Sequence, residues 1–192
     1  KLPYTPASVL KTSRKNIFPE DYNNIIRVLK KYNVKYLLYN GGNGSMGTCY
    51  KLYQTAKDDE LKVIGIPKTI DNDITETDHC PGYGSAARYM AVTTTEIAQD
   101  IASMPIHICI IEAMGRNAGW IAASSILARK KPEDAPHLVY VPEKPFIIDQ
   151  FLQDAATLYK QIGGVVVVVS EGITDQNGKP VDPLKLVKLV LG

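Results

Sequence analysis

Apolar residues recur along the chain at two spacings, one typical of strands and the other of helices. Short apolar runs bounded by glycine or proline predict strands at 34–39, 63–66, 106–111, 137–141 and 164–170. Apolar residues at helical spacing predict helices at 18–31, from the turn 41–47 to about 57, and at 84–102, 115–129, 149–162 and 182–191. Residues 1–15 contain two prolines and little periodicity, which indicates a loop.

This alternation of strands and helices predicts an α/β fold of mainly parallel sheets with crossover helices. The five consecutive valines at 165–169 are typical of a strand buried on both faces. A cluster of breakers at 80–84 precedes the longest predicted helix, so we place a boundary there. We expect two Rossmann-like lobes, 1–83 and 84–192, with the site in the cleft between them.

Composition excludes several classes of protein. With 45% apolar and 22% charged residues and a net charge of +2, the 192-residue chain favours neither a nucleic-acid nor a membrane surface. No run approaches the roughly 18 apolar residues of a transmembrane helix. The three cysteines lack metal-ligand spacing, which predicts reduced thiols in a cytoplasmic protein. Because the chain begins with Lys1, we expect it to be a piece of a longer one.

The strongest candidate for chemistry is the loop 67–73, Pro-Lys-Thr-Ile-Asp-Asn-Asp. It follows the strand 63–66, and open α/β sheets bind ligands at the carboxyl ends of their strands. Asp71 and Asp73 stand one residue apart there. Asp-Asn-Asp is also compatible with a plain turn, since both residue types bond their own backbone.

A glycine-rich turn at 41–47 also follows a strand and opens a helix, where backbone N–H groups bind phosphates. Gly42, Gly44 and Gly47 match the G-x-G-x-x-G pattern of dinucleotide-binding folds. Those folds have an acidic residue about 20 positions later, at the end of the second strand. Lys68 lies there instead, so the pattern argues against a dehydrogenase.

Two further turns follow predicted strands. Arg116, in the turn 112–120, lies at the start of a predicted helix, where a cation is unfavourable without a nearby anion. A surface arginine packed over Trp120 is the alternative. Glu171 follows the valine strand and is compatible either with a site residue or with an exposed glutamate.

Taken together, these turns resemble four ordered motifs of the phosphofructokinase family. Residues 41–45 (GGNGS) resemble its donor-phosphate loop, and 67–73 (PKTIDND) its catalytic loop. Residues 112–116 (EAMGR) resemble its sugar-phosphate loop, and 170–172 (SEG) its S/T-E-G turn. The resemblance extends from about residue 8 to the end.

The resemblance implies phosphoryl transfer to the 1-hydroxyl of fructose 6-phosphate in glycolysis, with Mg²⁺ as cofactor. Asp71 would be the general base, with Thr69, Asp73 and Arg116 as further catalytic residues. The donor would bind to Gly42, Asn43, Gly44, Ser45 and Lys68, and Mg²⁺ to Asn43 and Asp73. The sugar phosphate would bind to Thr69, Asp71, Met114, Gly115, Arg116 and Glu171. A homo-oligomer, either a dimer or a tetramer, is also implied.

Several departures from the family pattern matter. The family's first glycine turn would precede Lys1, and its histidine and arginine after the S/T-E-G turn are missing, so we expect a central fragment. Asn43 replaces an aspartate tied to the metal. Gly44 leaves room for the α-phosphate of ATP, whereas Lys68 is typical of pyrophosphate enzymes. We predict ATP as donor, with pyrophosphate, or a catalytically silent regulatory or binding fragment, as alternatives.

Overall fold

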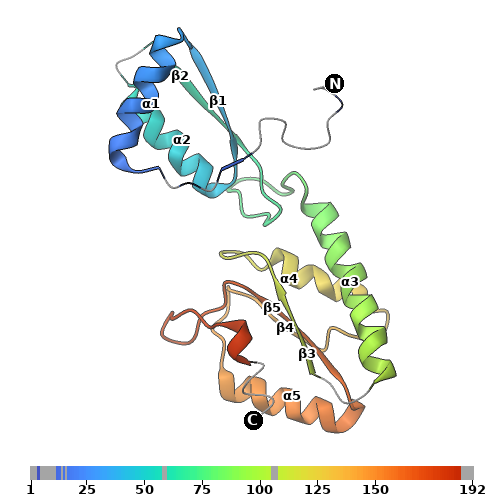
Figure 1. The fold of residues 1–192 in the computed structure, drawn as a ribbon. Helices are drawn as coiled ribbons and strands as arrows, with labels where there is room; N and C mark the ends of the chain where they lie inside the picture. The colour runs from blue at the N-terminus through green and yellow to red at the C-terminus, as the bar shows by residue number, and fades with distance from the viewer. Residues whose placement is uncertain are drawn as a thin grey trace. The chain divides into compact units, whose positions relative to one another are not determined.

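The chain folds into two compact units, Lys1–Pro67 and Lys68–Gly192. The computed structural model describes residues 4, 12–13, 15, 17–57, 60–104 and 108–186. Every pair of neighbouring strands is parallel, which confirms the predicted α/β fold (Figure 1). The division into compact units follows Pro67, so the loop 68–82 belongs with the helix that follows it, and the predicted lobes 1–83 and 84–192 stay a prediction. Tyr83, the first residue of that helix, donates its N–H to the Cys80 carbonyl at 3.1 Å.

The first unit is a two-stranded sheet with helices on one face. Its elements are, in order, α1 (Pro19–Lys31), β1 (Tyr36–Gly41), α2 (Asn43–Thr55) and β2 (Lys62–Pro67). Tyr22 and Ile26 of α1 pack with Leu52 of α2 to form its core. The helix α1 begins at a proline, and the Asp21 carboxylate accepts the Phe18 N–H at 3.0 Å, as expected for acids in a first turn.

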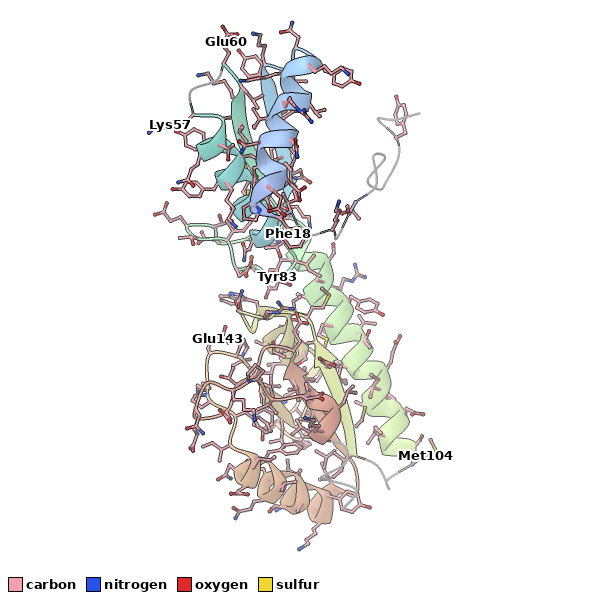
Figure 2. The ribbon with its side chains drawn as sticks, turned by 60° about the vertical axis from the view of Figure 1, so that its left-hand side comes forward. Phe18, Lys57, Glu60, Tyr83, Met104 and Glu143 are labelled. Atoms are coloured by element: carbon pink, nitrogen blue, oxygen red, sulfur yellow. The ribbon has the colours of Figure 1, made fainter. Side chains whose placement is uncertain are left out.

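The second unit has three layers. It contains α3 (Tyr83–Ser103), β3 (Ile108–Ala113), α4 (Trp120–Ser124), the 3₁₀ helix η2 (Ser125–Ala128), β4 (Leu138–Tyr140), α5 (Ile148–Ile162) and β5 (Val165–Ser170). The strand order is β3-β5-β4, so β5 is central. Figure 2 labels Tyr83 and Met104 at the two ends of α3.

The valine strand β5 is buried on both faces, as predicted. All five valines have no exposed surface. Val165, Val167 and Val169 pack with Phe151 and Ala155 of α5. On the other face, Val168 packs with Met90 of α3 and with Ile121 and Ala122 of α4. Alternate side chains of one strand therefore fill two cores, one on each side of the sheet (Figure 1).

One predicted helix begins later than expected. The pattern predicts a helix from Gly115 to Arg129, but α4 begins at Trp120 and passes into η2 after Ser124. Gly115 has φ +118°, which a helix cannot use. The hydroxyls of Ser124 and Ser125 donate to carbonyls three residues back, which accompanies the tighter winding of η2. Residues 183–186 are helical, while 187–191 and 106–107 lie outside the described part of the chain.

None of the helices in the described ranges has the length and apolar character needed to cross a membrane. The three cysteines are free thiols, as predicted.

Truncation of Phe151 tests the core between β5 and α5. Phe151 has no exposed surface, and its ring meets those of Tyr140 and Phe146 at centroid distances of 5.8 and 5.5 Å. Phe151→Ala leaves a cavity, so we expect it to lower the free energy of unfolding by about 3–5 kcal/mol in urea titrations. The control, Leu127→Ala, removes a 72% exposed side chain of the same unit and should change it by less than about 0.5 kcal/mol. Similar values for both variants would contradict this account of the core.

Candidate active site

The carboxyl ends of the strands in the second unit bring several loops to one edge of the sheet. Ala113, the last residue of β3, is paired in register with Ser170, the last residue of β5. Tyr140, at the end of β4, is paired with Val169. The loops after these strands therefore start side by side, although they are far apart in the sequence. Ligand sites of parallel sheets occur at such an edge.

The loop 68–82 is held in shape by Asn72. This residue is 7% exposed and has φ +57°, a left-handed conformation that asparagine tolerates better than most residues. Its side-chain oxygen accepts the Cys80 N–H at 2.8 Å, and its side-chain nitrogen donates to the Asp78 carbonyl at 3.3 Å. The bridge fixes the backbone between Asp71 and Asp73 and so holds these two carboxylates in place.

Asp71 is the most perturbed carboxylate of this loop. Burial raises its pKa above the ordinary value, and the neighbouring Asp73 and then Glu171 raise it further. The Thr69 hydroxyl and Lys68 act in the opposite direction but do not cancel the rise. Its Oδ1 atom is enclosed and accepts no hydrogen bond from the described residues. A carboxylate that is partly desolvated, surrounded by like charges and short of a donor is typical of a catalytic group.

Thr69 supports Asp71 from within the same loop. It is 8% exposed, and its hydroxyl oxygen accepts the Asp71 N–H at 3.1 Å. The influence of Glu171 on the pKa of Asp71 places the end of β5 within electrostatic reach of this loop. The structure thus brings together five of the predicted residues, Lys68, Thr69, Asp71, Asp73 and Glu171.

The loop after β3 is bound to the turn after β5 through Gly115. The Ser170 hydroxyl donates to the Gly115 carbonyl at 2.5 Å, and the Gly115 N–H donates to Glu171 Oε1 at 3.3 Å. Met114 and Arg116, on either side of Gly115, are exposed. Arg116 makes no ion pair with any residue of the described ranges, and it lies in the loop and not at a helix start as predicted. Its cationic group therefore remains available to an anion.

Glu143, which the sequence analysis did not identify, holds the far end of this loop. It follows β4 and is labelled in Figure 2. Its Oε1 accepts the Gly119 N–H at 2.8 Å. Tyr83 adds a second link, because its ring lies 5.7 Å from His79 and 6.3 Å from Trp120, both edge to face. No local pattern could have paired these residues. Asn72 and Ser170, in contrast, belong to two of the sequence motifs. The available signal was that each is a polar residue next to an acidic one.

The glycine turn 41–45 belongs to the first unit and is described separately. Gly42 precedes α2, which begins at Asn43 and not after Gly47 as predicted. The N–H groups of Gly44 and Ser45 lie in the first helical turn, where a helix has no acceptor of its own for them. A side chain at Gly44 or at Gly47 would meet nothing within 4 Å. The third glycine of a dinucleotide fingerprint permits close helix–strand packing, so the open space at Gly47 also argues against a dehydrogenase.

The carboxylates of this site suit a cation that substrate phosphates also coordinate better than a cation held by protein ligands alone. In the described part of the chain, no group of three or more His, Cys, Asp or Glu side chains could hold a metal ion. Mg²⁺ is usually bound by one or two carboxylates together with substrate phosphates. Asp73, beside the enclosed Oδ1 of Asp71, fits that mode.

Comparison with known proteins identifies the family. The sequence model of the family described as Phosphofructokinase matches residues 2–189. A pyrophosphate–fructose 6-phosphate 1-phosphotransferase of Xanthomonas campestris is 47% identical over 163 residues, covering 82% of this chain and 39% of that protein. An enzyme of the same name from Rhodospirillum rubrum is 39% identical, covering 92% and 44%. An ATP-dependent 6-phosphofructokinase of Amycolatopsis methanolica is 32% identical, covering 84% and 36%.

A solved structure agrees in fold. The pyrophosphate-dependent phosphofructokinase of Nitrosospira multiformis superposes with a TM-score of 0.74 at 40% identity, covering 90% of this chain and 46% of the other. The chain spans less than half the length of these relatives. Since the family match extends over nearly the whole sequence, the chain belongs to the phosphofructokinase family.

Proposed function

We propose that the chain carries the catalytic and sugar-phosphate loops of an enzyme that transfers a phosphoryl group from pyrophosphate to the 1-hydroxyl of fructose 6-phosphate. The product is fructose 1,6-bisphosphate. The observation that carries the proposal is the state of Asp71. Its carboxylate has a raised pKa, and one of its oxygens is enclosed and accepts no hydrogen bond from the described residues. Asp71 lies in the loop that follows β2, within electrostatic reach of Glu171.

Asp71 acts as the general base in this proposal. Its carboxylate accepts the proton of the attacking hydroxyl, and a raised pKa makes the carboxylate a stronger base. The reaction demands mainly positioning and charge stabilisation from the protein. Thr69, buried and bonded to the Asp71 backbone, orients that residue and the transferring phosphate.

The loop after β3 provides the sugar-phosphate site. The exposed guanidinium of Arg116 is suited to a phosphate, because its planar N–H groups bind two oxygens at once. The Met114 and Gly115 backbone lines the same site. Glu171 has one carboxylate oxygen on the Gly115 N–H, and we propose its other oxygen as the acceptor of a sugar hydroxyl.

Mg²⁺, when bound, would neutralise charge on the transferred phosphoryl group. Asp73 is the residue of the second unit that we propose to hold it, and Asn43 remains the predicted ligand of the first unit. A homo-oligomeric state and a cytoplasmic location also remain predictions.

The donor proposal reverses the ATP prediction made from the sequence. That prediction relied on Gly44, where a Cβ would meet nothing within 4 Å, so the glycine by itself does not favour ATP. Relatives that are 39–47% identical bear names of pyrophosphate enzymes, whereas an ATP-dependent relative is 32% identical. Lys68 is exposed and close enough to Asp71 to lower its pKa, so its ammonium is available to a donor phosphate beside the base.

Replacement of Asp71 tests the base. We expect Asp71→Asn in the full-length protein to lower kcat for fructose 6-phosphate by at least about a hundredfold, a typical general-base contribution. The KM for fructose 6-phosphate should change little, because the amide has the same shape. The matched control is Asp78→Asn, since this exposed residue of the same loop contacts Asn72 only through its backbone carbonyl. A kcat within tenfold of wild type for Asp71→Asn would exclude Asp71 as the base.

Steady-state rates with the two donors test the donor proposal. The wild-type protein should have a higher kcat/KM for pyrophosphate than for ATP. Lys68→Met removes a charge-assisted hydrogen bond of about 1.5–3 kcal/mol, so it should lower kcat/KM for pyrophosphate roughly ten- to a hundredfold. Lys144→Met, at an exposed lysine of the second unit, is the control. A wild-type preference for ATP would overturn the donor assignment while leaving phosphoryl transfer to the sugar in place.

A further inference from the structure

The turn 170–172 holds the loop after β3 by both backbone polar groups of one residue, Gly115. The Ser170 hydroxyl donates to the Gly115 carbonyl at 2.5 Å, and the Glu171 carboxylate accepts the Gly115 N–H at 3.3 Å. Ser170 has no exposed surface, so water does not compete for its hydroxyl. Two neighbouring residues of one turn thus fix the carbonyl and the amide of the residue between Met114 and Arg116.

The backbone around this contact has little space in which to move. A methyl group at Gly172 would overlap the carbonyl of Arg116, and one at Gly115 would overlap the carbonyl of Ala118. Gly115 has φ +118°, a conformation that the contacts to the turn help to maintain. The Ser170 oxygen also accepts the Gly172 N–H at 3.4 Å, which ties the turn to itself.

The geometry points to Ser170 as a positioning residue for sugar-phosphate binding, acting through Gly115 on Met114 and Arg116. This inference rests on the proposed function of that loop. The Arg116 side chain is exposed and forms no ion pair with the described residues, so its placement depends on the backbone beneath it. Without the Ser170 hydroxyl, the Gly115 carbonyl loses its donor and the loop can shift relative to Glu171. The sugar phosphate would then lose the alignment between Arg116 and Glu171.

Ser125 offers a matched control within the same unit. It also has no exposed surface, and its hydroxyl also donates to a carbonyl, that of Ala122, at 2.5 Å. This bond lies within the segment formed by α4 and η2 and touches neither loop of the site. Ser125→Ala therefore removes an equivalent buried hydrogen bond without disturbing the contact between Ser170 and Gly115.

The experiment compares Ser170→Ala with Ser125→Ala in the full-length protein. Urea midpoints and steady-state rates with fructose 6-phosphate and pyrophosphate are measured for both. Both variants should lower the midpoint to a similar extent. Only Ser170→Ala should raise the KM for fructose 6-phosphate, by about tenfold or more, while the KM for pyrophosphate stays within about twofold. Ser170→Thr, which retains a hydroxyl, should restore the KM.

Ser170→Cys guards against a Ser170→Ala variant that fails to fold, because a thiol fills the space but is a weak donor. It should raise the KM for fructose 6-phosphate as Ser170→Ala does. Normal KM values in whichever of these two variants folds, or equal KM changes in Ser125→Ala, would overturn the inference alone. No turnover of fructose 6-phosphate by the wild-type protein would overturn the proposed function, and this inference with it.

Discussion

Burial of β5 on both faces is the constraint on which the second unit depends. Its five valines have no exposed surface, so each face of the strand requires apolar cover. The helix α5 covers one face, and α3 with α4 covers the other. The central position of β5 between β3 and β4 follows, since an edge strand would leave one side of the ladder open. The end of β5 consequently lies between the ends of both neighbours, which places Ser170 and Glu171 among the loops of the site.

The residues of the site divide into a buried set that shapes the backbone and a more exposed set that faces a ligand. Asn72 and Ser170 are buried. Asn72 bonds backbone groups of its own loop, and Ser170 bonds a carbonyl that is 55 residues away in the sequence. Lys68, Arg116 and Glu171 are exposed, and the loops fix where their side chains start. Such a division suits the proposed phosphoryl transfer, in which the protein would contribute chiefly geometry and charge.

The carboxylates of the site would repel an anionic substrate, so the proposed reaction requires added positive charge. Asp73 and Glu171 both raise the pKa of Asp71, so three carboxylates act on one another. Lys68 is the cation that opposes them in that balance. A phosphate donor bound there adds more negative charge. Arg116 and a divalent cation held by Asp73 are the proposed sources of compensation.

The sequence by itself determined the alternating elements, the doubly buried valine strand and the motifs that mark the family. Each of these is a local property, because apolar spacing, breakers and short polar patterns can be recognised within a few consecutive residues. The donor could not be settled from Gly44, since a Cβ at this position would meet nothing within 4 Å and the glycine is not needed to make room.

Only the tertiary structure decided the start of α4, the partner of Glu143 and the boundary between the units. Gly115 is drawn out of the helical conformation by Ser170 and Glu171, more than fifty residues away in the chain. Glu143 contacts Gly119, 24 residues earlier in the chain, and the loop 68–82 joins α3 through the bond from the Tyr83 N–H to the Cys80 carbonyl. The physical reason is common to the first two. Hydrogen bonds between distant residues outweighed the local preference, and neither composition nor spacing encodes which distant groups will meet.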